Sequence, residues 1–269
     1  MHEKMFLQVL SFAGCIAMLC SCTPVSPTQP PDANDSPSSI PTEASNVASV
    51  TIDDIISTQI PPQFAGMEVI EDTSLVDWGI YPFPENMISL SDAIVYGTVT
   101  DKQYINFSED AWTEFHFTVE QTLQGNVSTD AALTIYSSGG YITQYDQFTA
   151  QGMRERITDR TDAQLQNTIV HQHANYHFDP LVEKKYILFL TQTDSDSILP
   201  QDTYQIVGAK YCQLCETAPD TFSYIAFGPD PENPDAVFSP DDPVVQMTRK
   251  EMESLVSTES ENTKRKVLS

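Results

Sequence analysis

The stretch WTEFHFTVEQTL, residues 112–123, decides the fold class, because its apolar and polar side chains alternate. Phe115, Phe117 and Val119 fall on one face, and the residues between them, mostly polar, fall on the other. Successive side chains of a strand point to opposite faces of a sheet. This period of two therefore predicts a strand with one buried face and one solvated face.

Other segments extend the β pattern on both sides of this strand. Residues 94–100 and 131–137 are predicted as strands, and YILFLTQ at 186–192 is a nearly continuous apolar run, typical of a fully buried strand. Residues 203–210 and 222–227 are predicted to pair as a hairpin. The sequence therefore predicts a mainly β domain spanning residues 49–257.

Helical signals are fewer. Thr51 and Asp54 are spaced as the cap of a short helix, and residues 158–170 form a polar helical stretch inside a long insertion, 139–180. Residues 244–256 are predicted to form a C-terminal helix whose apolar face consists of Val244, Val245, Met252 and Val256. A flexible tail, 258–269, is expected after it.

Several motifs occur in the order of a known module: SDAIVYGTV (91–99), FTV (117–119) with LQG (123–125), LTIY (133–136) and KYILFL (185–190). Over residues 90–227 the chain resembles the netrin-like module that is also found in tissue inhibitors of metalloproteinases. The resemblance implies an OB-like five-stranded barrel, here with the insertion 139–180 between strands 3 and 4. The inhibitors chelate zinc through a free N-terminal cysteine and carry a disulfide ladder, and this chain departs from both features. The resemblance therefore implies the fold and not protease inhibition.

The first 22 residues predict an export signal, with a polar start, an apolar run from Met5 to Leu19, and LCSC at 19–22. The run is shorter than the about 20 apolar residues of a membrane span. Leu19 and Ser21 before Cys22 resemble the lipobox of bacterial surface lipoproteins, which implies cleavage after residue 21 and acylation of Cys22, for example with palmitate. Cys15 and Cys20 fit the cleavage pattern less well. An uncleaved anchor or ordinary secretion are the alternatives.

Residues 22–48 are rich in Pro, Ser and Thr and contain no large aromatic residue. Such a segment cannot bury enough surface to offset its ordering entropy, so we expect a disordered tether. The chain is then held outside the cytoplasm, lipid-anchored to the bacterial cell membrane.

The net charge is −25, from 13 basic and 38 acidic residues. Such a chain is repelled by nucleic acid, which we exclude as a partner. A cation, a peptide or a protein remains a possible ligand class, besides the membrane reached through the lipid anchor.

Cys212 and Cys215 are the one cysteine pair beyond the predicted signal. Their CxxC spacing fits a disulfide, a zinc site or a redox dithiol, and an oxidising compartment favours the disulfide. His171, His173 and His177 lie within seven residues, and His171 and His173 would share one face of a strand. They are adventitious surface histidines, or they complete a zinc site with the two cysteines.

The acidic residues Asp194 and Asp196, and a second cluster within 230–242, lack the spacing of a calcium loop and are read as solvated loops. Nothing in the sequence selects a catalytic residue, and no cofactor is expected unless zinc binds. The sequence therefore favours a non-enzymatic binding module of the cell envelope, with the insertion 139–180 and the loop at 212–215 as its recognition face. The alternatives are a metal-dependent or thiol-based enzyme that uses the same cysteines and histidines, and a structural envelope component.

Overall fold

Two long strands, β2 (Ala93–Phe107) and β3 (Asp110–Gln124), form the centre of the fold and pair antiparallel along their whole length. The computed structural model describes residues 49–73, 82, 84–107, 109–227 and 243–267, all within one unit, Ala48–Ser269. The predicted signal peptide, the acylated Cys22, the tether and the acidic cluster at 230–242 lie outside the described residues.

The main sheet has eight strands rather than the five that were expected. In pairing order they are β11 (Val244–Thr248), β10 (Thr221–Ile225), β9 (Leu214–Ala218), β7 (Lys185–Gln192), β2, β3, β4 (Ala132–Ser138) and β8 (Tyr204–Ile206). Strand β8 pairs parallel with β4 and antiparallel with β7, so the pairings β7–β2–β3–β4–β8–β7 form a closed ring. Strands β9, β10 and β11 continue the sheet outward from β7.

The predicted hairpin between 203–210 and 222–227 is wrong. Strand β8 ends at Ile206. Beyond it, the buried side chain of Gln213 accepts from the Phe189 amide of β7 and donates to the Val207 carbonyl, so these backbone groups bond to a side chain instead of to a neighbouring strand. Strand β10 pairs instead with β9, across a tight turn at Asp220, and with β11.

The core confirms the two strongest strand predictions. All five residues from Tyr186 to Leu190 of β7 are fully buried, because this strand is covered on both faces. On β3, Phe115, Phe117 and Val119 are fully buried while the side chains between them are partly or fully exposed. The alternation of the sequence is thus the alternation of the two faces of β3.

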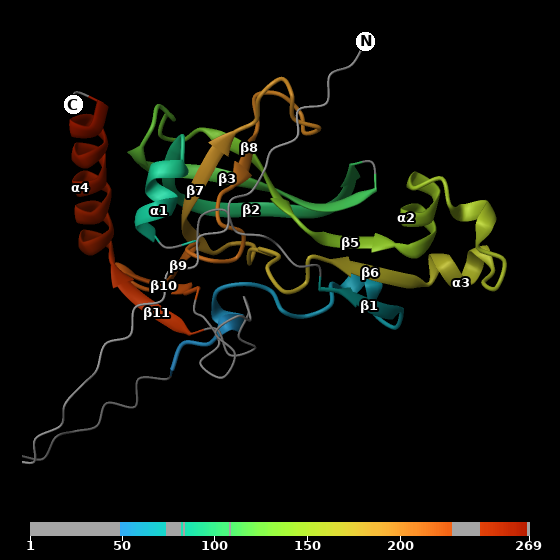
Figure 1. Cartoon of the computed structure of the whole chain (residues 1–269). Helices are drawn as coiled ribbons and strands as arrows, with labels where there is room; N and C mark the ends of the chain where they lie inside the picture. The colour runs from blue at the N-terminus through green and yellow to red at the C-terminus, as the bar shows by residue number, and fades with distance from the viewer. Residues whose placement is uncertain (1–48, 74–81, 83, 108, 228–242, 268–269) are drawn as a thin grey trace, which may run out of the picture. The chain divides into compact units, whose positions relative to one another are not determined.

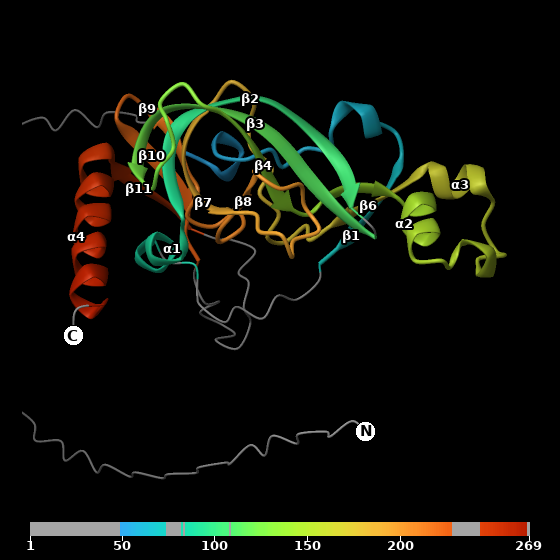
Figure 2. The same ribbon diagram turned by 90° about the horizontal axis from the view of Figure 1, so that it is seen from above.

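The insertion 139–180 supplies two strands of a second, three-stranded sheet, in the order β1 (Glu68–Asp72), β6 (Thr168–Gln172), β5 (Gly140–Thr143). Between β5 and β6 the chain forms α2 (Gln144–Ala150), a 3-10 turn η3 (Arg154–Arg156) and α3 (Asp162–Gln166), which lie at one end of β2 and β3 (Figure 1, Figure 2). The predicted helix at 158–170 is therefore confirmed only over α3. Its last three residues belong to a strand, because Thr168, Ile169 and Val170 are β-branched. All three pair with β1, and Ile169 and Val170 also pair with β5.

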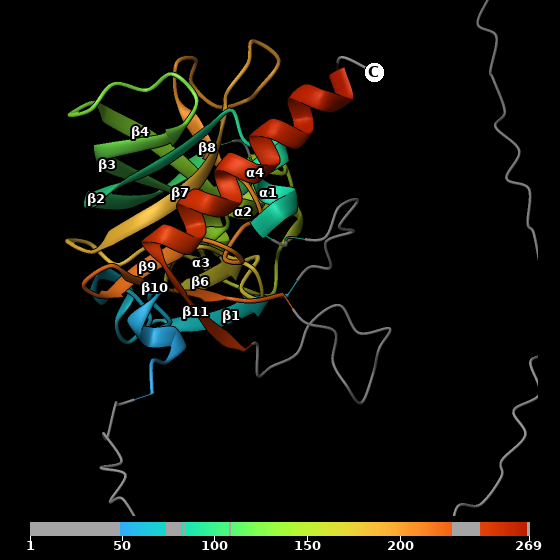
Figure 3. The same cartoon turned by 90° about the vertical axis from the view of Figure 1, so that its left-hand side faces the viewer.

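The C-terminal helix α4 (Arg249–Val267) lies at the opposite end, beside α1 (Pro84–Leu90), as Figure 3 shows. Met252 and Val256 are buried as predicted, whereas Val244 and Val245 belong to β11. The tail expected from residue 258 is helical to Val267, because the sequence there is rich in Glu, Lys and Arg, which favour helix. Among the described residues, no helix is long and apolar enough to cross a membrane.

The segment that precedes the sheets begins with a 3-10 turn, η1 (Ile52–Asp54), and continues to η2 (Pro62–Phe64). The predicted cap is confirmed: the Asp54 carboxylate accepts from the Thr51 amide at 2.8 Å. Beyond it, Ile56 forms a β-bridge with Pro180, and the Ser57 amide donates to the Asp179 carbonyl. These contacts place residues 57–60 across the end of the insertion.

Candidate functional site: a buried histidine relay beside a cavity

Two of the predicted histidines meet where the second sheet packs against β3. His171 lies on β6 directly opposite Glu71 of β1, and its Nδ1 is 2.8 Å from Glu71 Oε2. The Nε2 of His171 is 3.1 Å from the Nδ1 of His177, which follows β6. The Nε2 of His177 is 2.6 Å from Thr113 Oγ1 of β3. Four residues from three strands and one loop thus form one continuous hydrogen-bonded chain.

The hydrogen bonds of this chain fix its protons when both rings are neutral. A neutral imidazole has one donor and one acceptor. His171 must carry its proton on Nδ1, because only a donor can face the Glu71 carboxylate, so its Nε2 accepts from Nδ1–H of His177. The Nε2 of His177 then accepts the hydroxyl proton of Thr113 at 2.6 Å, and the longer contact of this hydroxyl with the Gly139 carbonyl, 3.2 Å, is secondary. Both rings are therefore Nδ1–H tautomers.

Burial keeps both rings neutral. His177 is 4% exposed, and its pKa is lowered well below the usual value, mainly by burial and further by the neighbouring His171 and Lys102. Burial also lowers the pKa of His171, against the opposing effect of the Glu71 carboxylate.

The histidine pair has no free nitrogen to offer. The ring centres are 5.3 Å apart and the facing nitrogens are 3.1 Å apart. The difference, 2.2 Å, corresponds to about 1.1 Å from each nitrogen to the centre of its own ring, which is close to the radius of an imidazole ring. The two nitrogens therefore lie nearly on the line between the ring centres, as in a linear hydrogen bond. A tetrahedral metal ion would need lone pairs that converge at one side. Among the described residues, no group of three His, Cys, Asp or Glu side chains is placed to hold a metal ion.

A second polar cluster lies against the first. Asp179 is buried and forms an ion pair with Lys102 Nζ at 2.6 Å, and its other oxygen accepts from the Tyr104 hydroxyl at 2.8 Å. Burial raises the pKa of the Asp179 carboxyl, while Lys102 and the Tyr104 hydroxyl oppose that change. Burial and the Asp179 charge raise the pKa of Tyr104 far above its usual value.

A cavity of about 290 Å³ opens beside the histidines and beneath residues 57–60. Its polar wall includes Ser57, Glu71, Tyr141, His171 and His177. Its apolar wall consists of Ile52, Ile56 and Ile60, and Thr58, Ala174 and Lys210 complete it. A neighbouring cavity of about 380 Å³ lies on the other side of the same segment and reaches Lys102 and Tyr104.

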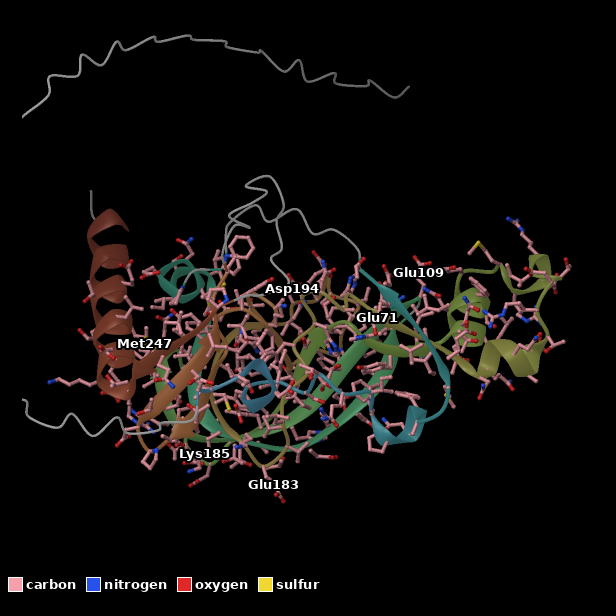
Figure 4. All side chains as sticks on the ribbon, turned by 90° about the horizontal axis from the view of Figure 1, so that it is seen from below. Glu71, Glu109, Glu183, Lys185, Asp194 and Met247 are labelled. Carbon is pink, nitrogen blue, oxygen red and sulfur yellow. The ribbon has the colours of Figure 1, made fainter. Side chains whose placement is uncertain are left out.

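Aromatic rings connect the two cavities. The ring of Tyr141 stacks on His171 with centroids 4.3 Å apart and planes 12° apart, and it meets Tyr104 edge to face at 5.0 Å. Phe64 of η2 contacts both tyrosine rings. These contacts hold the tyrosine and histidine rings at the cavity wall in one fixed orientation. Glu71 lies on the side of the molecule that carries α2 and α3, whereas Met247 of β11 lies beside α4 (Figure 4).

Comparisons with known proteins add no assignment. No family model, curated protein or solved structure matches the chain.

His173 does not share a face with His171, contrary to expectation. Strand β6 ends at Gln172, and His173 has a positive φ of 60°, which turns its side chain away from the strand pattern. Its Nδ1 bonds instead to the Tyr176 hydroxyl. The partner of His171 is therefore His177, which the turn after β6 brings back to it.

The structure does not bring the cysteines to the histidines, nor to each other. Cys212 and Cys215 are both free thiols, so the predicted disulfide is not formed. Cys212 has a positive φ of 64° and donates to the Pro82 carbonyl at 2.7 Å, whereas Cys215 on β9 faces the Asp54 carbonyl. Burial raises the pKa of both thiols, that of Cys215 to about 11, which disfavours the reactive thiolate.

The loop at 212–215 was expected at the recognition face together with the insertion. Cys212, Gln213, Leu214 and Cys215 are instead fully buried. Among the described residues of this loop, no side chain is available to a ligand. The insertion 139–180 does contribute to the cavity wall, through Tyr141, His171, Ala174 and His177.

The sequence did not reveal Glu71, Thr113 and Tyr141 as parts of the site. Each lies at least 30 residues from His171 along the chain. Glu71 and Tyr141 reach His171 through strand pairing, and Thr113 reaches His177 through its side chain. A signal existed for one of them: Glu71 follows Val69 and Ile70 in a short β-rich stretch, EVIED, that could have been read as an additional strand.

Proposed function

We propose that the protein is a non-enzymatic binding module, anchored by an acylated Cys22 outside the cytoplasm of a bacterial cell, and that its ligand occupies the cavity beside His171. The export and lipobox pattern at residues 1–22 supports this localisation. The pattern of the tether, 22–48, supports a module held away from the membrane surface.

One observation carries the binding proposal. The cavity is preformed, yet all four nitrogens of its two histidines are already engaged by Glu71, by Thr113 and by each other. A histidine that acts as a general base needs a free nitrogen within reach of the substrate proton, and a metal site needs convergent free ligands. A polar wall whose histidine nitrogens are all engaged supports recognition rather than histidine-based or metal-based catalysis.

We further propose that the ring β7–β2–β3–β4–β8 is an OB-type barrel. Five strands closed by the β7–β8 pairing support this assignment, as does the parallel pairing of β4 with β8 within an otherwise antiparallel ring. The second sheet and the strands β9, β10 and β11 are then additions to the barrel.

The binding proposal is tested by thermal-shift titration of the full chain in detergent against four sets of small probes: alkylamines, alkylcarboxylates, monosaccharides and simple phenols. We expect one set to raise the melting temperature in a saturable way, because a ligand that binds only the folded state stabilises it. Tyr141→Ala should abolish that shift. If no set stabilises the protein, or if Tyr141→Ala responds like the wild type, the cavity is not a binding site.

The lipid anchoring is tested separately by metabolic labelling with a radioactive fatty acid in a bacterial host. The wild type should be labelled, and Cys22→Ala should lose the label and accumulate as precursor. A Cys22→Ala protein that stays labelled while Cys15→Ala or Cys20→Ala does not would move the anchor to the other cysteine.

A further inference from the structure

The wall of the cavity contains oxygen atoms that the fold does not use. Tyr141 is only 5% exposed, yet its hydroxyl has no hydrogen-bond partner among the described residues. Glu71 bonds to His171 through Oε2, and its Oε1 makes no hydrogen bond within the described part of the chain. The Ser57 amide donates to Asp179, while the Ser57 hydroxyl has no described partner. These three oxygens are therefore available to hydrogen-bond donors of a ligand in the cavity.

The charges at the wall favour a cation. The two histidines are neutral, and the Asp179–Lys102 ion pair behind them is internally compensated. Glu71 is the acidic side chain at the wall, and 54% of its side chain is exposed. Lys210 also lines the cavity and contributes one positive charge, but its ammonium lies over the Tyr211 ring at 5.1 Å rather than in an ion pair with Glu71. The net charge of −25 adds a field that attracts cations to the whole surface.

The rest of the wall fits an aliphatic stem. Ile52, Ile56 and Ile60 form one side of the cavity, and Ile60 is 49% exposed. An alkyl chain laid on these side chains would remove their apolar surface from water, which stabilises the complex.

We propose that the cavity binds a primary ammonium group on an aliphatic stem, the chemistry of a lysine side chain or of a small alkylamine. The inference rests on the proposed binding function and names its ligand class. A primary ammonium carries three N–H donors, and Glu71 Oε1, the Tyr141 hydroxyl and the Ser57 hydroxyl supply three acceptors. The stem lies against Ile52, Ile56 and Ile60. His171, neutral and bonded to Glu71 Oε2, holds the carboxylate in place.

The test is isothermal titration calorimetry of the full chain at pH 7.5 with n-butylammonium, butyrate, n-butanol and tetramethylammonium. We expect saturable binding of n-butylammonium alone, because butyrate has the opposite charge, butanol has none, and tetramethylammonium has no N–H donor. N-acetyl-lysine methylamide then distinguishes the source. Binding tighter than that of n-butylammonium points to a lysine within a polypeptide, and weaker binding points to a free amine.

Two variants test the named contacts. Glu71→Gln should weaken n-butylammonium binding at least tenfold, and the nearly isosteric Tyr141→Phe should weaken it several-fold. Glu155→Gln is the matched control, because it removes the same charge from an exposed position on η3 and should bind like the wild type. Melting curves establish that each variant is folded.

The outcomes separate the ligand class from the binding function. If butyrate, butanol or a monosaccharide binds and n-butylammonium does not, the ammonium proposal is overturned and the binding function stands. Glu71→Gln binding n-butylammonium as tightly as the wild type would also overturn the proposal. If no probe of any class binds, both proposals fall.

Discussion

Thr113 ends the hydrogen-bonded chain that runs from Glu71 through His171 and His177. It is fully buried, and its hydroxyl is the proton donor for His177 Nε2 at 2.6 Å. Thr113→Val keeps the shape but leaves that nitrogen without a donor, so we expect it to lower the free energy of unfolding by about 1–3 kcal/mol. Thr113→Ser keeps the hydroxyl and loses one methyl group, with a cost of about 1 kcal/mol. Urea denaturation measures both, and equal losses would mean that the hydrogen bond contributes nothing.

Cys212 and Cys215 show how a local pattern can be misread at the scale of one residue. The CxxC spacing favoured a disulfide, but the left-handed backbone at Cys212 directs its thiol to Pro82 while Cys215 faces Asp54. We expect the purified protein to have the mass of the fully reduced chain. Both thiols should react with Ellman's reagent slowly until denaturant is added, since both are buried. A mass two units lower, or a missing thiol in denaturant, would contradict this.

Strand β2 depends on a glycine where it passes close to β3. A Cβ at Gly97 would lie 2.0 Å from the Thr118 carbonyl oxygen of β3, at a shift in the pairing register. We expect Gly97→Ala to lower the free energy of unfolding by more than about 3 kcal/mol, because backbone must move to admit the methyl group. Gly66→Ala is the control: a Cβ there meets no atom within 4 Å, and only the positive φ costs about 1 kcal/mol. Equal losses in the two variants, measured by urea denaturation, would show that the strands at Gly97 are not closely apposed.

Elements differ in how far the sequence predicts them. Strand β3 was predicted from its alternation and β7 from its continuous apolar run, because burial imposes both patterns directly. Strand β8 falls within the predicted strand 203–210, but its pairing with β4 and β7 was not predicted, and β11 was expected to be the start of a helix. The sequence could not show that β8 closes the ring onto β7, because that pairing depends on the Gln213 side chain and on the turns around it.

At the scale of the whole molecule, the site was only half predictable. The histidine cluster stands out in the sequence, but the groups that define its chemistry come from β1, β3 and β5, and the second sheet that collects them was not foreseen. The predicted zinc ligands were chosen by proximity along the chain. In the structure, strand register determines the partners instead: His171 lies opposite Glu71, and His173 bonds to Tyr176.

The same assembly makes the stability of the protein depend on pH. The folded state lowers the pKa of His171 and of His177, in both cases mainly through burial, and also that of His173. A group whose pKa is depressed on folding stabilises the protein fully above its unfolded pKa, here about 6.5, and loses that contribution as the pH falls through the folded value. We therefore expect the free energy of unfolding to be constant from pH 8 to 7 and to fall below pH 6.5.

The slope of that fall reports the protons taken up on unfolding, at about 1.4 kcal/mol per pH unit for each. Asp179 acts in the opposite direction, because its raised pKa stabilises the folded state as the pH decreases through the folded value.

His177→Gln removes the most deeply buried of the three rings, so its unfolding free energy should change less between pH 6.5 and 5 than that of the wild type. His116→Gln makes the same substitution at an exposed position on β3 and is the control for the substitution itself. Urea denaturation at half-unit steps of pH measures each slope. If His177→Gln were as pH-sensitive as the wild type, protonation of the relay would not be what destabilises the fold.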